Sequence, residues 1–323
     1  MSQAQVAPRV ALIGARRVRQ GLGPYVAKHL QHAGAQVVGF VGTSAASRAQ
    51  AATGLREMLD HHVPGFASLK ELVQATMPQA VAILSPPETH AEYLEQALEL
   101  GLHTLCEKPL LWGPDGAADA RRAAAHVAGF QARGLLLAEN CQWPQVLDCA
   151  RELAPQAFAS APTQFAMGLE PAAAGQRMVG DALSHPISLL QALAPGPAEL
   201  QKVAASWSQN GAALDLKFSF QTAQSRIEAL VELRQTDNTP RGAWLELNGV
   251  RFQRLVRLAD YSMLLAAGER ELDLDDPLAS LLQGFVTELR AVLGGAPPPN
   301  TAALVERADF LAQLRSICQQ ESP

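Results

Sequence analysis

A lysine at the end of an apolar run is the first residue of this chain whose setting suggests chemistry. Residues 85–111 read SPPETHAEYLEQALELGLHTLCEKPLL, so the run leads directly into Glu107-Lys108-Pro109. A lysine placed there can hydrogen-bond a reacting oxygen and stabilise its developing negative charge. Burial would lower the pKa of Lys108 towards the range of acid–base use. Glu107 could orient the ammonium and Pro109 would fix the turn, although the pair alone also fits a surface Glu-Lys at a strand end.

The second candidate is the pair Asp181 and His185, within the stretch GDALSHPISLLQAL. Residues four positions apart share one face of a helix, so the carboxylate and the imidazole would point together. Histidine suits proton transfer because its unperturbed pKa lies near physiological pH. The pair also fits an ordinary aspartate at a helix N-terminus and an unrelated histidine before Pro186.

The first half of the chain alternates strand and helix patterns. Apolar runs predict strands at about 9–13, 36–41, 80–84, 102–106 and 135–138. Helix patterns lie between them, at about 23–32, 45–52, 68–75, 90–100 and 115–131. This alternation predicts βαβ units and a parallel sheet, with a dinucleotide at the carboxyl ends of the strands.

The second half of the chain lacks this alternation. After a helical stretch at 145–153, strand patterns follow one another at about 203–208, 213–220, 226–234, 243–248 and 251–258, separated by turn residues. Strands without intervening helices favour a largely antiparallel sheet. Two helices, at about 277–293 and 302–319, close the chain. We therefore expect two domains, 1–138 and 139–323.

Composition excludes several classes of function. A net charge of −5 gives no positive field to attract nucleic acid. No apolar run reaches the roughly 18 residues of a membrane span, and the first residues do not read as a secretory signal. The four cysteines have no CxxC spacing, so we expect reduced thiols and no metal site. The expected location is the cytoplasm, without a membrane or nucleic-acid partner.

The stretch at 85–111 resembles the Gfo/Idh/MocA family of oxidoreductases, whose signature here is the tripeptide Glu107-Lys108-Pro109 after a strand, a helix and a second strand. The resemblance implies a Rossmann domain, doubly wound, followed by a domain with an open-faced, largely antiparallel sheet. It also implies that Lys108 lies beside the nicotinamide. Because one face of the second sheet forms dimers in this family, a homo-oligomer, dimer or tetramer, is expected.

The resemblance also assigns residues of the substrate site. Asp181 and His185 are similar to the family's D-x-x-x-H, in which the histidine exchanges a proton with the substrate hydroxyl and the aspartate holds substrate or tunes the imidazole. Leu183 and Ser188 depart from that pattern, where Gly and Asp are frequent. Asn140 and Gln142 match a segment that lines the cleft near the nicotinamide, with Gln142 at the usual arginine position, and are expected to contact substrate.

The turn after the first strand departs from the G-x-G-x-x-G of dinucleotide-binding folds. Residues 14–19 read GARRVR, so Gly14 alone aligns, and Gly21 and Gly23 stand too late to replace the other glycines directly. The arginines could contact phosphate through their side chains. Alternatively, the site has lost dinucleotide affinity, or the loop is simply basic and solvated. We expect retained binding.

The end of the second strand bears on which cofactor binds. Gly42-Thr43-Ser44, with Arg48 following, contains no acid to grip the ribose hydroxyls of NAD. Hydroxyls and an arginine accommodate a 2′-phosphate, so NADP is preferred over NAD, although Thr43-Ser44 also fits a plain helix N-cap. The residues expected to bind the cofactor are Gly14, Arg16, Arg17, Val18, Thr43, Ser44, Arg48, Ser85, Pro86, His90, Glu107 and Lys108.

The sequence thus predicts an NADP-preferring dehydrogenase or reductase with Lys108, Asp181 and His185 as catalytic residues. In the oxidative direction His185 would accept the hydroxyl proton, C4 of the nicotinamide would take the hydride, and Lys108 would stabilise the alkoxide-like oxygen. The resemblance points to a small-molecule substrate, a sugar, cyclitol or related polyol, or its ketone. The alternatives are an imine reductase and a dinucleotide-sensing protein without turnover.

Overall fold

The computed structural model describes residues 6–16, 21–257 and 262–321. The chain divides into two compact units, which are described separately. The first contains residues 1–113, 121–140 and 278–304, and the second contains residues 114–120, 141–277 and 305–323. This division differs from the predicted one in that residues 278–304 return to the first unit and 114–120 join the second.

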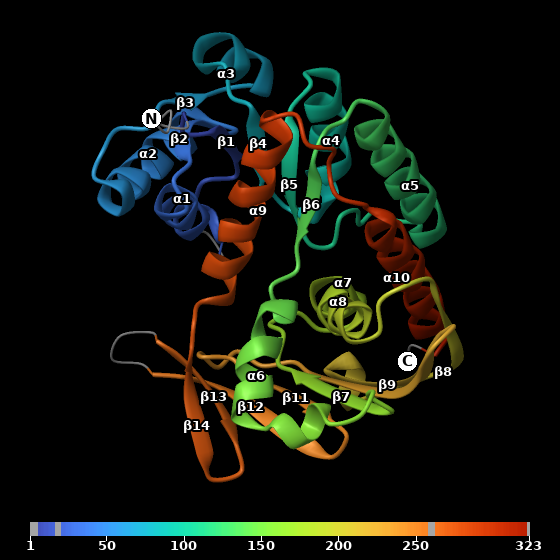
Figure 1. Cartoon of the computed structure of the whole chain (residues 1–323). Helices are drawn as coiled ribbons and strands as arrows, with labels where there is room; N and C mark the ends of the chain where they lie inside the picture. Colours follow the sequence, from blue (N-terminus) through green and yellow to red (C-terminus); the bar gives the residue numbers. More distant parts are fainter. Residues whose placement is uncertain (1–5, 17–20, 258–261, 322–323) are drawn as a thin grey trace. The chain divides into compact units, whose positions relative to one another are not determined.

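The first unit is built on a six-stranded, all-parallel sheet (Figure 1). Its strand order is β3-β2-β1-β4-β5-β6, the doubly wound order of a Rossmann fold, and the predicted fold class is confirmed. The strands are β1 (Arg9–Ile13), β2 (Gln36–Val41), β3 (Gly65–Phe66), β4 (Ala80–Ile83), β5 (His103–Glu107) and β6 (Leu137–Asn140). The strand order reverses between β1 and β4, so the cofactor crevice is expected there.

Two helices of this unit, α2 (Ala45–Leu59) and α3 (Leu69–Thr76), begin at serine N-caps. The others are α1 (Gly23–His32), α4 (His90–Glu99), α5 (Gly116–Ala132) and α9 (Pro277–Leu293), of which α5 and α9 each lend their first residues to the second unit. Ser44 and Ser68 accept backbone N–H bonds at the first turns of α2 and α3. A short 3-10 turn, η1 (Pro87–Thr89), precedes α4.

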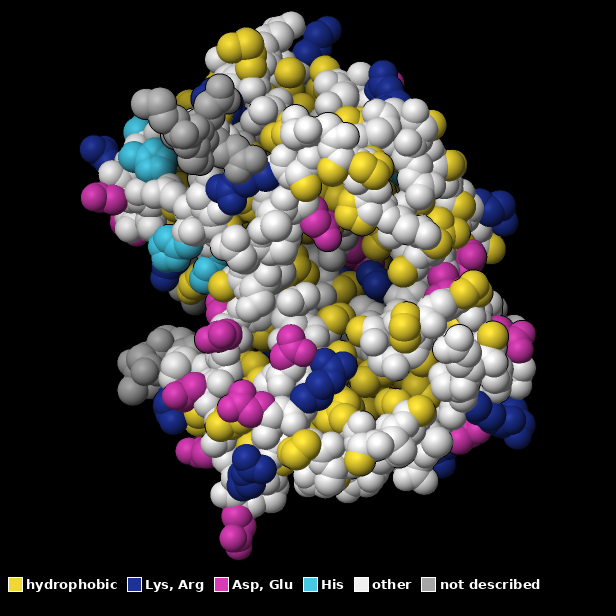
Figure 2. All heavy atoms as spheres, in the orientation of Figure 1, with side chains coloured by type: hydrophobic (Ala, Val, Ile, Leu, Met, Phe, Trp, Pro, Cys, Tyr) yellow, Lys and Arg dark blue, Asp and Glu magenta, His cyan; other side chains and the backbone are white. Residues whose placement is uncertain are grey.

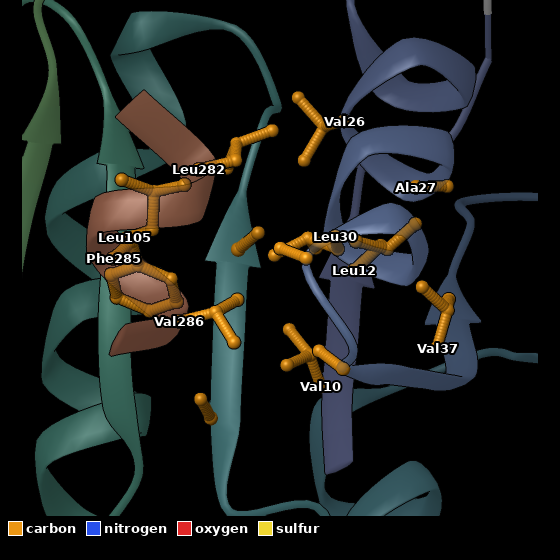
Figure 3. Close-up of a cluster of buried hydrophobic side chains, with 14 of the residues drawn as sticks. Val10, Leu12, Val26, Ala27, Leu30, Val37, Leu105, Leu282, Phe285 and Val286 are labelled. Carbon is orange, nitrogen blue, oxygen red and sulfur yellow. The ribbon is translucent and has the colours of Figure 1, made fainter. Parts of the chain in front are cut away.

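Helix α9 completes the core of the first unit. Leu282, Phe285 and Val286 of α9 are 0–3% exposed and lie in one apolar cluster with side chains of β1 and α1 (Figure 3). Arg290 fixes the far end of this helix, because its Nη2 donates to the carbonyl of Gly34 at 2.8 Å. A segment from the C-terminal part of the sequence therefore supports the sheet that carries the predicted cofactor edge.

The second unit has an eight-stranded sheet in the order β14-β13-β12-β11-β7-β10-β9-β8. Every neighbouring pair is antiparallel except β7 and β10, which confirms the largely antiparallel prediction. The strands are β7 (Gln164–Leu169), β8 (Ala198–Ser208), β9 (Ala213–Thr222), β10 (Arg226–Arg234), β11 (Ala243–Leu247), β12 (Val250–Val256), β13 (Met263–Ala267) and β14 (Arg270–Leu274).

Helices pack on one face of this sheet. They are α6 (Leu147–Leu153), α7 (Gln176–Ala182), α8 (Ser184–Leu193) and α10 (Ala302–Gln320), with the 3-10 turns η2 (Trp143–Val146) and η3 (Pro155–Phe158) around α6. The indole of Trp207 donates to Cys318 O at 2.9 Å, and Phe220 meets Phe310 edge to face at 5.8 Å, so α10 is tied to β8 and β9. On the opposite face, Trp244, Glu246 and Arg251 keep surface exposed.

Two features bear on possible membrane and nucleic-acid partners: the character of the described helices and the charge distribution on one face. Among the described helices, none combines the length and the apolar character needed to cross a bilayer. On the face drawn in Figure 2, acidic and basic side chains are interspersed.

Candidate active site

Four loops of the first unit leave its sheet at one edge. Because all six strands are parallel, the residues that follow β1, β2, β4 and β5 leave the sheet on the same side. These loops carry Gly14, Thr43, Ser85 and Lys108. The first unit therefore gathers the described part of the predicted cofactor set at the edge where doubly wound folds bind dinucleotides.

Gly14 lies where the two central loops come closest. Its φ of +89° belongs to the left-handed region, and a Cβ there would stand 2.7 Å from the carbonyl oxygen of Leu84. No other residue type fits such an approach without displacing the backbone. The tight turn after β1, packed against the loop after β4 at the crossover, is the part that the first glycine plays in a dinucleotide-binding turn, so this part of the site fits a dinucleotide.

Gly23 packs the start of α1 against the turn after β1, a role that its late position in the sequence did not predict. A Cβ on Gly23 would stand 2.7 Å from Ala15 Cα and from Gly14 O, so α1 begins in direct contact with the turn after β1. This close helix–strand packing is the job of the third glycine in G-x-G-x-x-G, which stands five residues after the first. Here it stands nine after Gly14, with Pro24 next to it. The loop is longer, and its last glycine is kept.

The arginines of this loop are only partly described. Arg16 is exposed and, with Ala15 and Pro24, borders a hollow of about 370 Å³ whose other wall is the outer face of α2. Arg17 and Val18, both predicted to bind the cofactor, lie outside the described residues. Arg16 therefore stands beside the glycine turn with its guanidinium accessible.

At the end of β2, the hydroxyl of Ser44 is used as a helix cap. Ser47 N donates to Ser44 Oγ at 3.1 Å, and Ser44 N donates to Ser47 Oγ at 3.0 Å, a reciprocal capping box. Arg48 Nη1 donates to the carbonyl of Gly42 at 3.0 Å, which holds this side chain at the strand end. The N-cap interpretation of Ser44 is confirmed, while Thr43 is exposed and the turn contains no acid.

The carboxylate of Glu107 is held by the neighbouring strand. Glu107 lies opposite Asn140 in the β5–β6 register, and Asn140 Nδ2 donates to Glu107 Oε1. Burial raises the pKa of Glu107, while the attraction of Lys108 and the amide of Asn140 oppose that rise. Asn140 is 1% exposed. Its amide therefore positions Glu107, and through it the adjacent lysine.

The turn that carries Lys108 is fixed by two buried side chains. His90 is fully buried, with Nδ1 2.9 Å from Pro109 O and Nε2 2.9 Å from Ser85 O. Leu110 N donates to Glu139 Oε1 at 2.8 Å, and the Lys108–Pro109 peptide is cis. Burial lowers the pKa of His90 although the two carbonyls oppose this. His90 thus ties the loop after β4 to the loop after β5, and Glu139 braces the second of them.

The second unit carries the predicted Asp181 and His185 on two successive helices. Asp181 lies in the last turn of α7 and His185 in the first turn of α8, with Leu183 between them in helical conformation. Pro186 has no N–H to continue the α7 ladder, which accounts for the interruption. Because Leu183 keeps helical angles, the spacing of the pair is close to that of one helix.

The segment after β6 meets the start of α8. Cys141 Sγ lies 3.8 Å from Ser184 O, and η2 packs against α8. Gln142 is partly exposed and Trp143 is buried. Gln142 directly follows Cys141, the residue that contacts the start of α8. Within the described part of the chain, no group of three His, Cys, Asp or Glu side chains is placed to hold a metal.

Gly23→Ala tests the role of the displaced glycine. Because the added Cβ would overlap the turn after β1, a distortion of only ~1.4 kcal/mol would weaken NADPH binding about tenfold. Calorimetric titration measures this, with Gly284→Ala in α9 as the control, since nothing lies within 4 Å of a Cβ there. Equal affinities in the two variants would contradict the packing role.

Glu107→Gln tests the buried carboxylate by the pH dependence of stability. A raised folded-state pKa makes the folded protein bind the proton more tightly, so stability falls as pH rises from about 4.5 through the folded pKa. Removing the charge flattens this fall in the unfolding free energy. Urea unfolding from pH 4 to 8 measures it, and Glu99→Gln, on the exposed side of α4, serves as the control. An unchanged slope in the Glu107 variant would count against the burial.

Comparison with known proteins gives the same picture as the geometry. Residues 8–132 match the family model described as "Oxidoreductase family, NAD-binding Rossmann fold". No curated protein matches the sequence significantly.

Solved structures of the same fold cover nearly the whole chain. A UDP-N-acetylglucosamine 3-dehydrogenase from Acidithiobacillus ferrooxidans is 19% identical, with a TM-score of 0.69 over 98% of this chain and 100% of that one. An inositol dehydrogenase homolog from Azotobacter vinelandii, complexed with NADH and myo-inositol, is 15% identical, with a TM-score of 0.69 over 99% and 97%.

A third neighbour is a mutant 3-ketoreductase from Actinomadura kijaniata, in complex with TDP-benzene and NADP. It is 19% identical, with a TM-score of 0.68 over 98% of both chains. At these identities the neighbours establish the fold, while the family match rests on the first unit. Residues 8–132 thus match the NAD-binding Rossmann domain of the Gfo/Idh/MocA oxidoreductase family, and the two sheets together have the fold of these neighbours.

Proposed function

We propose that this protein is an NADP-preferring dehydrogenase or reductase that acts on a hydroxyl or ketone carbon of a sugar, cyclitol or related small molecule. The observation that supports the proposal most directly is the set of contacts that fix the turn containing Lys108. Lys108 follows β5 at the cofactor edge, beside the Glu107 carboxylate that Asn140 holds, on a turn braced by His90 and Glu139. A lysine without a chemical task does not need such support from two strands and a helix.

Residues of the first unit fit the cofactor. Gly14 and Gly23 let the turn after β1 pack closely against the loop after β4 and the start of α1, which brings that helix N-terminus to the cofactor edge, where it suits a pyrophosphate. The exposed Thr43 and Arg16, with Arg48 at the end of β2, favour a 2′-phosphate over free ribose hydroxyls. When bound, NADP supplies a hydride donor or acceptor at C4 of its nicotinamide.

The proposal assigns each remaining residue a role. Lys108 donates a hydrogen bond to the reacting oxygen and stabilises its negative charge. His185 takes the hydroxyl proton in oxidation and returns it in reduction, and Asp181 tunes its imidazole or holds the substrate. Gln142 contributes a neutral amide to the substrate site. Asn140 acts through Glu107, since its side chain is buried against that carboxylate.

The substrate class follows from what the neighbours are said to act on. One is a UDP-N-acetylglucosamine 3-dehydrogenase, one holds myo-inositol, and one is a 3-ketoreductase. All three concern polyols or sugar ketones. We propose the same chemistry here.

We also propose a homo-oligomer formed by the exposed face of the second sheet. Gly168 leaves room on β7 for the indole of Trp244, since a Cβ there would stand 2.1 Å from Trp244 Nε1. Arg251 lies over that ring at 3.7 Å, so the indole is stacked between the strand and a guanidinium on this face. Sedimentation velocity should give a dimer or tetramer, and Trp244→Glu should shift it to the monomer. A monomeric wild type would refute the proposal.

The cytoplasm is the proposed location. Cys106, Cys141, Cys149 and Cys318 are all free, and three of them are buried. Reduced thiols of this kind are typical of a reducing compartment.

Two alternatives differ from this proposal in their observables. An imine reductase would use the same cofactor site but reduce C=N bonds. A dinucleotide-sensing protein would bind NADPH without turning over any substrate. Both keep the first unit and differ in the chemistry of Lys108 and His185.

Calorimetric titration with NADPH and NADH is the decisive first experiment. We expect NADPH to bind more tightly than NADH, and Lys108→Ala to lower turnover of a polyol or ketone about 10²-fold or more, a larger loss than its loss of NADPH affinity. Lys70→Ala, on the exposed side of α3, is the matched control. Absence of binding for both dinucleotides would refute the proposal, and tight NADPH binding without turnover of polyols, ketones or imines would favour the sensor.

A further inference from the structure

Strand β12 carries two arginines beside tryptophan rings, and only one has a counter-ion. Arg251 lies over Trp244, and its Nε donates to Glu246 at 3.1 Å. Arg254 points to the opposite face of the sheet, where its guanidinium lies 5.4 Å from the centroid of Trp143. No carboxylate among the described residues pairs with Arg254. The two side chains have similar aromatic neighbours and opposite charge balance.

The guanidinium of Arg254 is poorly satisfied. Nη2 donates to the carbonyl of Arg241 at 3.1 Å, while Nε is buried without a hydrogen-bond partner in the described chain. Burial alone lowers the pKa of Arg254, with no carboxylate acting against it. An arginine nevertheless stays protonated. Arg254 is partly buried, and its Nε is fully so. A largely desolvated cation without a counter-ion among the described residues is unfavourable, and an anion that reaches its accessible part relieves this.

The nearby acid is committed elsewhere. Glu170 follows β7 and accepts the backbone N–H of Gly242 at 2.8 Å, which holds the chain at the start of β11. Arg241, next to that glycine, also has a buried Nε without a partner in the described residues. Two guanidinium groups therefore lie at this end of the sheet without a neutralising carboxylate.

Within the second unit, Arg254 is linked to the predicted proton-transfer residue by a short series of contacts. Trp143, which lies beside its guanidinium, follows Cys141 by two residues, and Cys141 meets the carbonyl of Ser184. His185 is the next residue along α8. The buried cation and His185 are thus connected by one short segment of described chain.

We propose that Arg254 is a specificity-determining residue that binds an oxyanion of the substrate, a carboxylate or a phosphate, against the ring of Trp143. The inference rests on the proposed function for its reaction, but the binding itself is measured separately. Guanidinium and oxyanion make charge-assisted, two-point hydrogen bonds, so the group selects acidic sugars or sugar phosphates over neutral polyols.

The test measures three probe ligands on the NADPH-loaded protein. UDP-N-acetylglucosamine carries phosphates, glucuronate carries a carboxylate, and myo-inositol carries no charge. We expect at least one anionic probe to bind about tenfold or more tightly than myo-inositol, and Arg254→Gln to weaken that probe about tenfold or more while NADPH affinity is unchanged. The preferred probe distinguishes phosphate from carboxylate.

Controls separate a ligand site from a structural cation. Arg257→Gln removes the next arginine, which is exposed and paired with Asp273 at 3.1 Å, and should change probe binding less than about twofold. Arg254→Gln should leave the melting temperature unchanged or raise it, because it removes an uncompensated charge. Asp260→Asn tests whether Asp260, which lies outside the described residues, serves as a counter-ion of Arg254. We expect this variant to change neither the melting temperature nor probe binding.

The outcomes that overturn the inference are specific. The first is that Arg254→Gln and the wild type bind the probes with equal affinity. The second is that a protein that binds NADPH binds neither anionic probe. The third is that Arg254→Gln, Asp260→Asn and the double variant all lower the melting temperature by the same amount. Loss of NADPH binding in the wild type would instead refute the proposed function. In that case the probes are titrated without cofactor, and their dependence on Arg254 decides the inference alone.

Discussion

The carboxylate of Glu107 is the constraint on which the cofactor edge of the first unit depends. A carboxylate at the end of a buried strand is unfavourable unless it is hydrogen-bonded and paired. Asn140 supplies the hydrogen bond from the neighbouring strand, and the charge of Lys108 stabilises the ionised form. The Glu107 carboxylate and the Lys108 ammonium therefore stabilise each other electrostatically. The position of the lysine follows from the register of β5 and β6 and not from the flexible reach of its own side chain.

The same edge shows how a phosphate loop can lengthen without losing its packing. Gly14 meets Leu84 at the crossover between β1 and β4, and Gly23 meets Ala15 at the start of α1. These two contacts fix where the loop leaves the sheet and where it enters the helix. Four additional residues between them change neither end. Length and arginine content can therefore vary in the loop while the geometry required by a pyrophosphate is kept.

Sequence patterns predicted the strands whose side chains are buried on both faces. They missed elements that are too short to show a pattern, and they could not show contacts between distant parts of the chain. The runs at 9–13 and 36–41 became β1 and β2 because nearly every side chain in them is buried. β3 was missed because two residues carry no periodicity, and β7 because Ala166 and Gly168 leave its outer face without a pattern. Nor could the sequence show that α9 packs into the first unit, since that follows from long-range contacts.

The site residues show the same limit. Lys108, Asp181 and His185 were predicted as catalytic residues because their types and spacing point to chemistry, and that assignment stays a prediction. The buried roles of His90 and Asn140 were not predicted, because a polar residue near a site in sequence gives no sign of which way it faces. Gly23 was dismissed because a fixed motif spacing was assumed. The adjoining Pro24, which favours the first turn of a helix, was the signal that marked where α1 starts.

Charge placement in the second unit gives the last link between fold and specificity. At position 142 the chain has a neutral glutamine where the family pattern has an arginine, and the next residue is the tryptophan that lies beside Arg254. The segment around Gln142 thus lacks an arginine, and Arg254 of β12 places a guanidinium beside the neighbouring Trp143. A guanidinium carried by β12 is held by a strand rather than by a loop, and its ring contact and backbone acceptor fix its plane. In the proposed function, selection of an anionic substrate would then depend on the sheet, and proton transfer on His185 of α8.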